Sequence, residues 1–191
     1  MKNIFNRGDF RYYRTDSVNK SRAPILEHSQ FAEHQTTVFI SHKHDDLDEL
    51  KDIIGFLEKQ YNVKTYIDSK DPTMPQMTNG ETAKRIKVRI AQCDKFILLA
   101  TNGAIESKWC NWELGYGDGQ KFNKKCIALF PIKDAIGDYK GNEYLEIYPY
   151  IVYRSYGDKY SDGRNIPPGY YVREKMPDGF NLTPLNEWLG R

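Results

Sequence analysis

A short stretch of the chain, Ser107-Lys-Trp-Cys-Asn-Trp-Glu113, combines aromatic rings with a carboxylate. If it is helical, the spacing i, i+3, i+4 and i+7 places four side chains on one face: Trp109, Trp112, Glu113 and Tyr116. Planar rings suit the face of a nicotinamide or an adenine, and a fixed carboxylate suits a cation that develops during a reaction. The same spacing also suits an aromatic core stripe with Glu113 at its edge, so the pattern alone leaves both interpretations open.

Polar side chains also follow the apolar segments that we expect to be strands. Ser41, His42 and Lys43 come directly after the first of them, and Thr101 and Asn102 come after the third. In an open parallel sheet, ligands bind beyond the carboxyl ends of the strands, at the point where the strand order reverses. For the order 2-1-3-4-5 this point lies between the first and third strands, so these five residues are candidates for substrate binding.

An anionic ligand such as a phosphate, bound at this point, would need hydrogen-bond donors. Ser41, Lys43 and the backbone N–H groups of the same loop are candidates, together with the amino end of the helix that follows. Asp45 and Asp46 would repel phosphate there, but acidic residues stabilise the first turn of a helix, so we expect at least one of them to cap it. Asp68, at the end of the second strand, either binds the substrate or turns the chain.

Hydrophobic periodicity indicates the elements that position these residues. Apolar and β-branched runs predict strands over 36–41, 63–67, 95–100, 126–132 and 144–153. Helical spacing and N-cap residues predict helices over 47–59 and 79–91, and a third that Ser107 caps, with a weak end among the glycines of 115–119. Alternating strands and helices predict parallel strands with right-handed crossovers. The expected fold class is α/β: a flavodoxin-like, five-stranded parallel sheet in the order 2-1-3-4-5 with helices on both faces.

We divide the chain into a basic N-terminal extension (1–35), a central domain (36–155) and a C-terminal extension packed on that domain (156–191). The first 22 residues carry six basic and two acidic side chains. A solvated arm explains this excess, and docking onto a partner or an anionic ligand is the alternative. The C-terminal extension is expected to wrap the sheet edge, with 182–189 as a short closing helix.

The composition argues against several classes of protein. The 191 residues carry 28 basic and 26 acidic side chains, and a formal net charge of +2 does not favour general nucleic-acid binding. The longest strongly apolar run, 96–100, is too short to cross a bilayer, and no signal-peptide core follows Met1. Three cysteines without CxxC spacing indicate reduced thiols. We therefore expect a cytoplasmic protein without membrane or nucleic-acid partners.

The sequence gives weaker support for three other functions: zinc binding, phosphate acceptance and catalysis by a cysteine. His42 and His44 have the spacing of zinc ligands, but no histidine follows residue 44, so we expect no metal site. The acidic pair after the first strand resembles that of a response regulator, but Ala100-Thr101-Asn102 stands where the phosphoacceptor aspartate would end the third strand. Cys110 has no downstream histidine to activate it, so we expect a buried, inert thiol.

Two segments of the central domain resemble the TIR (Toll/interleukin-1 receptor) domain family. Val38-Phe-Ile-Ser41 followed by His42-Lys-His-Asp-Asp46 looks like the family's first conserved box. Tyr66-Ile-Asp68 with Asp71-Pro-Thr-Met-Pro75 looks like its second strand and BB loop.

The third strand and the stretch after it carry a more specific resemblance. Phe96-Ile-Leu-Leu-Ala100 is similar to the third strand of the family. Residues 107–113 are similar to the serine-x-tryptophan-cysteine-x-x-glutamate motif of NAD-cleaving TIR domains. The resemblance covers residues 36–155, and it implies a flavodoxin-like fold.

The resemblance also implies NAD glycohydrolase or ADP-ribosyl cyclase activity, with NAD as the substrate and no cofactor. The family's catalytic glutamate corresponds to Glu113, and its neighbouring tryptophan corresponds to Trp109. Nicotinamide carries its positive charge before the bond breaks and leaves as a neutral base, so no general acid is required, and Glu113 would stabilise the ribosyl cation. The compact chain is similar to TIR proteins of Thoeris-type antiphage defence, in which the product would activate a downstream effector.

The family further implies self-association through TIR surfaces and the BB loop. Two alternatives remain at this point. One is a TIR module that only assembles with other TIR domains, and the other is an enzyme similar to nucleoside deoxyribosyltransferases, which attack a sugar carbon with one glutamate on a flavodoxin-like fold. Glu113 with Trp109 and Trp112 favours the NAD-cleaving enzyme.

Overall fold

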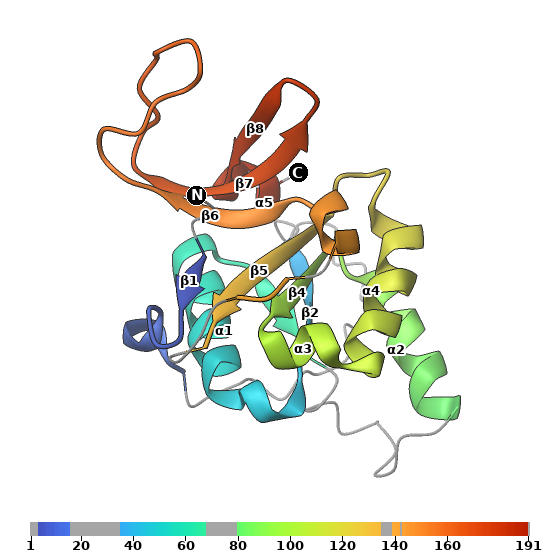
Figure 1. Ribbon diagram of the computed structural model, residues 1–191. Helices are drawn as coiled ribbons and strands as arrows, with labels where there is room; N and C mark the ends of the chain where they lie inside the picture. The colour runs from blue at the N-terminus through green and yellow to red at the C-terminus, as the bar shows by residue number, and fades with distance from the viewer. Residues whose placement is uncertain (1–3, 16–34, 68–79, 135–138, 142, 191) are drawn as a thin grey trace.

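The computed structural model describes residues 4–15, 35–67, 80–134, 139–141 and 143–190 (Figure 1). Eight strands form one sheet in the order β3-β2-β4-β5-β6-β7-β8, and β1 pairs with β5 beside this path. The strands are β1 (Phe5–Asn6), β2 (Thr37–Ser41), β3 (Lys64–Tyr66), β4 (Lys95–Ala100), β5 (Ile127–Lys133), β6 (Tyr150–Arg154), β7 (Gly169–Met176) and β8 (Gly179–Pro184).

The five strands from β2 to β6 confirm the predicted parallel sheet. They pair in parallel in the order β3-β2-β4-β5-β6, which is the order 2-1-3-4-5 within the central domain. All six residues of β4 are buried, as are the first six of β5. Continuous burial of this kind is typical of strands covered by helices on both faces.

The sheet is larger than the five strands expected from the sequence. β7 and β8 continue it as an antiparallel pair beyond β6, where we expected only a wrapping segment and a closing helix. The predicted fifth strand also begins late: residues 143–147 form the short 3-10 helix η4 (Glu143–Ile147), and β6 starts after Pro149. Proline lacks an N–H and restricts the residue before it, which separates the two elements.

Helices cover both faces of the sheet. The hydrophobic cluster on one face joins α1 (Leu47–Tyr61) and α5 (Leu185–Gly190) to the strands. The cluster on the opposite face joins α2 (Gly80–Gln92), α3 (Asn102–Glu106) and α4 (Lys108–Lys121). Figure 1 shows α2 and α4 running together along that second face. None of the helices in the described part of the chain has the length and apolar character needed to span a bilayer.

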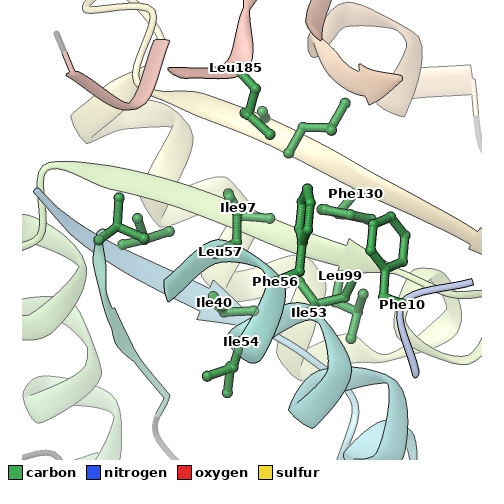
Figure 2. Close-up of a cluster of buried hydrophobic side chains, with 14 of the residues drawn as sticks. Phe10, Ile40, Ile53, Ile54, Phe56, Leu57, Ile97, Leu99, Phe130 and Leu185 are labelled. Carbon is green, nitrogen blue, oxygen red and sulfur yellow. The ribbon is translucent and has the colours of Figure 1, made fainter. Parts of the chain in front are cut away.

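Residues 4–15 of the N-terminal extension pack into the first hydrophobic cluster. Phe5 and Phe10 are 7% and 3% exposed, and the Phe10 ring centroid lies 4.8 Å from that of Phe56 and 5.2 Å from that of Phe130 (Figure 2). A Cβ on Gly55 of α1 would lie 1.9 Å from the backbone oxygen of Tyr13, so only glycine admits the arm there. The interpretation of this part of the chain as a solvated arm is therefore wrong.

Helix α4 does not weaken at its glycines, contrary to our expectation. It runs without a break from Lys108 to Lys121. At Gly117 an added Cβ would lie 3.0 Å from the ring of Phe96 in β4. The missing side chain lets the helix approach the sheet closely, and packing outweighs the low helix propensity of glycine.

Candidate active site

Glu113 lies buried at the switch point between β2 and β4. Ser107 caps α4, where its Oγ accepts a hydrogen bond from the backbone N–H of Cys110 at 3.3 Å, and the buried face of the helix then carries Glu113 one turn before Gly117. The carboxylate is in a residue that is 2% exposed. The hydroxyl of Ser41, at the carboxyl end of β2, donates to Glu113 Oε2 at 2.5 Å. The structure thus brings together two residues that are 72 positions apart in the sequence.

The aromatic side chains of α4 flank Glu113 rather than surround it. Trp109 and Trp112 stack with ring centroids 5.0 Å apart, and Trp112 and Tyr116 stack at 6.5 Å. The ammonium group of Lys87 in α2 lies 5.8 Å from the Trp112 centroid and 5.2 Å from that of Tyr116. All three rings are half-buried. The carboxylate occupies the core-facing side of the helix and the rings occupy its edge, which is the reverse of a core stripe with Glu113 at its margin.

The loop after β2 lies against the segment after β4, as the switch-point argument predicts. His42 is 7% exposed, and its Nδ1 lies 3.4 Å from the backbone oxygen of Ile40. Lys43 pairs with Asp45 at 3.2 Å. The aliphatic part of the Lys43 side chain runs so close to Gly103 that a Cβ there would lie 2.9 Å from its Cδ. Lys43 therefore bridges the ends of the two strands.

Thr101 and Asp46 form a buried hydrogen bond beside this bridge. Thr101 caps α3, accepting from the backbone N–H of Ala104 at 3.0 Å, and its hydroxyl donates to Asp46 Oδ2 at 2.5 Å. Asp46 makes no side-chain capping bond at the start of α1, so this member of the acidic pair does not supply the expected cap through its carboxylate. Its carboxylate makes tertiary contacts instead, because Thr101, directly after β4, and a residue of the N-terminal arm donate hydrogen bonds to it.

The partner from the arm is Arg7, which the sequence did not single out among six basic residues. Its guanidinium contacts Asp46 at 2.7 Å, Glu49 at 2.5 Å and Asp134 at 2.8 Å. The hydrogen bond from Arg7 holds the pKa of Asp134 below its usual value. Asp134 also accepts from the side-chain amide of Asn102 at 3.0 Å. We call Arg7 and its three carboxylate partners, Asp46, Glu49 and Asp134, the Arg7 cluster. The cluster connects the N-terminal arm to the carboxyl ends of β2, β4 and β5.

The other residues singled out in the sequence lie at the rim of the site, in the core or outside the described residues. Asn102 also accepts from the backbone N–H of Lys140 at 3.0 Å, so it belongs to the rim of the cluster. Asp68 and the predicted BB loop, residues 71–75, lie outside the described residues. Cys110 is 1% exposed, as expected for a structural thiol, and burial raises the pKa of Cys93 to about 12. Within the described ranges, no group of three or more His, Cys, Asp or Glu side chains is placed to hold a metal ion.

We predict that Ser41→Ala lowers the free energy of unfolding by about 1–3 kcal/mol, because a buried carboxylate oxygen loses a donor. The loss should be smaller in a chain that already carries Glu113→Gln, since a hydrogen bond to a charged group is stronger than one to an amide. Chemical denaturation of the four chains in this double-mutant cycle measures the coupling. Equal losses in both backgrounds would contradict a charge-assisted bond.

Comparisons with known proteins bear on the family of the chain. A sequence model described as "TIR domain" matches residues 38–178. A protein of Bacillus cereus (strain MSX-D12), named "Probable 3' cyclic ADP-D-ribose synthase ThsB'", is 29% identical to the chain over 161 residues, which cover 73% of this chain and 82% of that protein. The family match extends past β6 into the antiparallel strand β7, beyond the limit of 155 that the motifs alone indicated. With more than half of its residues matched by the family model, the chain belongs to the TIR domain family.

Proposed function

We propose that this chain is an NAD-processing TIR enzyme that breaks the bond between nicotinamide and ribose. The products are nicotinamide and either ADP-ribose or a cyclic or conjugated form of it, so the enzyme is an NAD nucleosidase or an ADP-ribosyl cyclase. The observation that carries the proposal is the buried Glu113 carboxylate, which Ser41 holds at the switch point of the sheet. The similarity to a protein named as a cyclic ADP-ribose synthase supports the same chemistry.

The chemistry follows from the charge of the substrate. The electron pair of the breaking carbon–nitrogen bond moves onto the ring nitrogen of nicotinamide, which cancels its charge. The ribose carbon becomes cationic, and Glu113 stabilises it; one preorganised electrostatic group of this kind contributes about 3–4 kcal/mol to the transition state. Water then completes a hydrolysis, whereas a nucleophile within the same molecule completes a cyclisation. Trp109 lies at the end of the stack that continues through Trp112 to Tyr116, and it offers a ring face to the base.

The burial of Glu113 adds a requirement. A carboxylate in a residue that is 2% exposed cannot meet a dinucleotide until neighbouring groups move aside. Assembly with a second TIR domain is one event that could drive this movement, and it agrees with the self-association that the family resemblance implies. We therefore propose that the chain is activated by assembly, and that in bacteria its product signals to an effector during phage infection.

One experiment separates this function from its alternatives. Purified protein is incubated with NAD and, separately, with deoxynucleosides, in the presence and absence of lysate from infected cells, and the products are identified by mass. Nicotinamide with ADP-ribose or an isomer of cyclic ADP-ribose is the expected result. Free base from deoxynucleosides alone would favour the deoxyribosyltransferase. A chain that assembles but releases no base under any condition would be the non-catalytic module.

A further inference from the structure

A cavity of about 350 Å³ lies over strands β5 to β8. None of its described lining residues belongs to the Glu113 site, by which we mean Glu113, Ser41 and the three rings of α4. The volume falls within the range of small-molecule sites, about 300–1,000 Å³. Leu129, Pro131 and Leu145 form an apolar wall, and the rings of Tyr139 and Tyr150 form an aromatic one. Burial raises the pKa of Tyr139 to about 12, so this ring stays neutral. An apolar cavity with aromatic walls accommodates a flat ring.

The guanidinium of Arg173 lines the cavity and lies against two aromatic rings. Arg173 lies opposite Tyr150 in the antiparallel β6–β7 ladder and donates a hydrogen bond to its hydroxyl. Its guanidinium carbon lies 5.4 Å from the Tyr150 centroid and 4.7 Å from that of Phe180. In the part of the chain that the structure describes, no carboxylate lies within ion-pair distance of it. A guanidinium has five N–H donors, so most of them remain for a ligand.

A second cation stands beside Arg173. Lys175 is two residues further along β7, and alternate residues of a strand share a face; both line the cavity. Lys175 pairs at 3.4 Å with Glu146, which also lines the cavity, and the two side chains are 68% and 49% exposed. An exposed ion pair contributes about 0–1 kcal/mol, so an anion at Arg173 can recruit the ammonium group without a large penalty.

We propose that this cavity binds an aromatic anion of mononucleotide size, with its ring against Tyr139 and Tyr150 and its phosphate on Arg173 and Lys175. Arginine recognises phosphate through paired N–H donors, and two cations suit a group that carries between one and two negative charges. The proposal is independent of NAD cleavage, because the cavity and the Glu113 site share no lining residue.

Isothermal titration of the full chain with AMP tests this proposal. We expect saturable binding of one AMP per chain, weakened roughly tenfold or more by Arg173→Met, since a charge-assisted contact to phosphate is lost. Lys175→Met should weaken binding in the same direction, and because this side chain is exposed the variant keeps the test valid if Arg173→Met fails to fold. Arg164→Met is the matched control: it removes an exposed arginine that does not line the cavity, and AMP affinity should not change.

Two further ligands define the chemistry of the site. Adenosine, which lacks the phosphate, should bind more weakly than AMP, and nicotinate, which carries a carboxylate instead, should also bind more weakly. No binding of AMP, equal binding of adenosine, tighter binding of nicotinate, or AMP binding that survives both Arg173→Met and Lys175→Met would each overturn the proposal. If NAD cleavage also fails to appear, the AMP result still stands on its own.

Discussion

Glu113→Gln is expected to abolish nicotinamide release from NAD while the protein stays folded. Glutamine has nearly the same shape, and its carbonyl oxygen can still accept the hydrogen bond from Ser41. The variant loses only the negative charge that faces the developing ribosyl cation. Removal of one preorganised electrostatic group lowers kcat by about 100-fold to 1,000-fold, so the rate should fall at least that far when nicotinamide is measured by mass.

Glu106→Gln is the matched control for this prediction. Glu106 ends α3, close in sequence to α4, and its side chain is 69% exposed, with a long ion pair to Lys140 at 3.7 Å. The same chemical change there should leave both nicotinamide release and stability unaltered. Full activity of Glu113→Gln, with the fold verified by circular dichroism, would refute the assignment of Glu113 as the catalytic residue.

Arg7→Met is expected to produce the largest loss of stability among single changes that remove a charge from the N-terminal arm. The substitution leaves Asp46, Glu49 and Asp134 close together without the cation that all three contact. Removal of one partner from a buried ion pair costs about 3–5 kcal/mol, and we expect the lower end because the Arg7 side chain is 27% exposed. Denaturant unfolding at neutral pH measures the loss.

The pH dependence distinguishes loss of charge from loss of packing. In the natural protein Arg7 lowers the pKa of Asp134 below the ordinary 3.8, so this contribution is present above that pH and disappears as the pH falls through the lowered pKa. In the variant, the three carboxylates repel one another when they are ionised, so the free energy of unfolding of the variant should fall as the pH rises. The difference between the two proteins should therefore be large at pH 7 and shrink at acid pH.

Arg11→Met controls for a change of charge within the same arm. Arg11 lies in the short 3-10 helix η1 (Arg11–Tyr13), and its side chain is exposed. A change there should alter the free energy of unfolding only slightly. A difference between Arg7→Met and the natural protein that stays constant with pH would show that the Arg7 cluster acts through packing alone.

The Arg7 cluster also connects the N-terminal arm to the helices that position Glu113. Asp46 joins the arm to Thr101, which caps α3, and Asp134 joins it to Asn102. α3 leads directly into α4, which carries Glu113. Loosening the arm therefore removes restraints at the carboxyl ends of three strands at once.

Local sequence patterns determined the main strands and helices of this protein and the order of its parallel strands. The β-branched run before Ser41 and the apolar run before Thr101 predicted β2 and β4, because the hydrophobic pattern of a strand depends only on residues that are neighbours in the sequence. Ser107 predicted the start of α4 because capping needs only the first turn. The parallel order followed from chain connectivity, and that order placed the ends of β2 and β4 together. The choice of Glu113 as the catalytic residue remains a prediction, although the structure does bury it at the expected switch point.

Only the tertiary structure decided how the remaining side chains are used. Arg7 looked like one solvated charge among six, yet it contacts carboxylates 39, 42 and 127 positions away. Asp46 is one of the two acidic residues of which at least one was expected to cap α1, and it accepts instead from Arg7 and Thr101. The rings of Trp112 and Tyr116 lie against the ammonium group of Lys87 in α2. The physical reason is the same in each case. A local pattern specifies which face of an element is buried, whereas a charge or a ring takes the partner that other elements bring within a few ångströms once the sheet has formed.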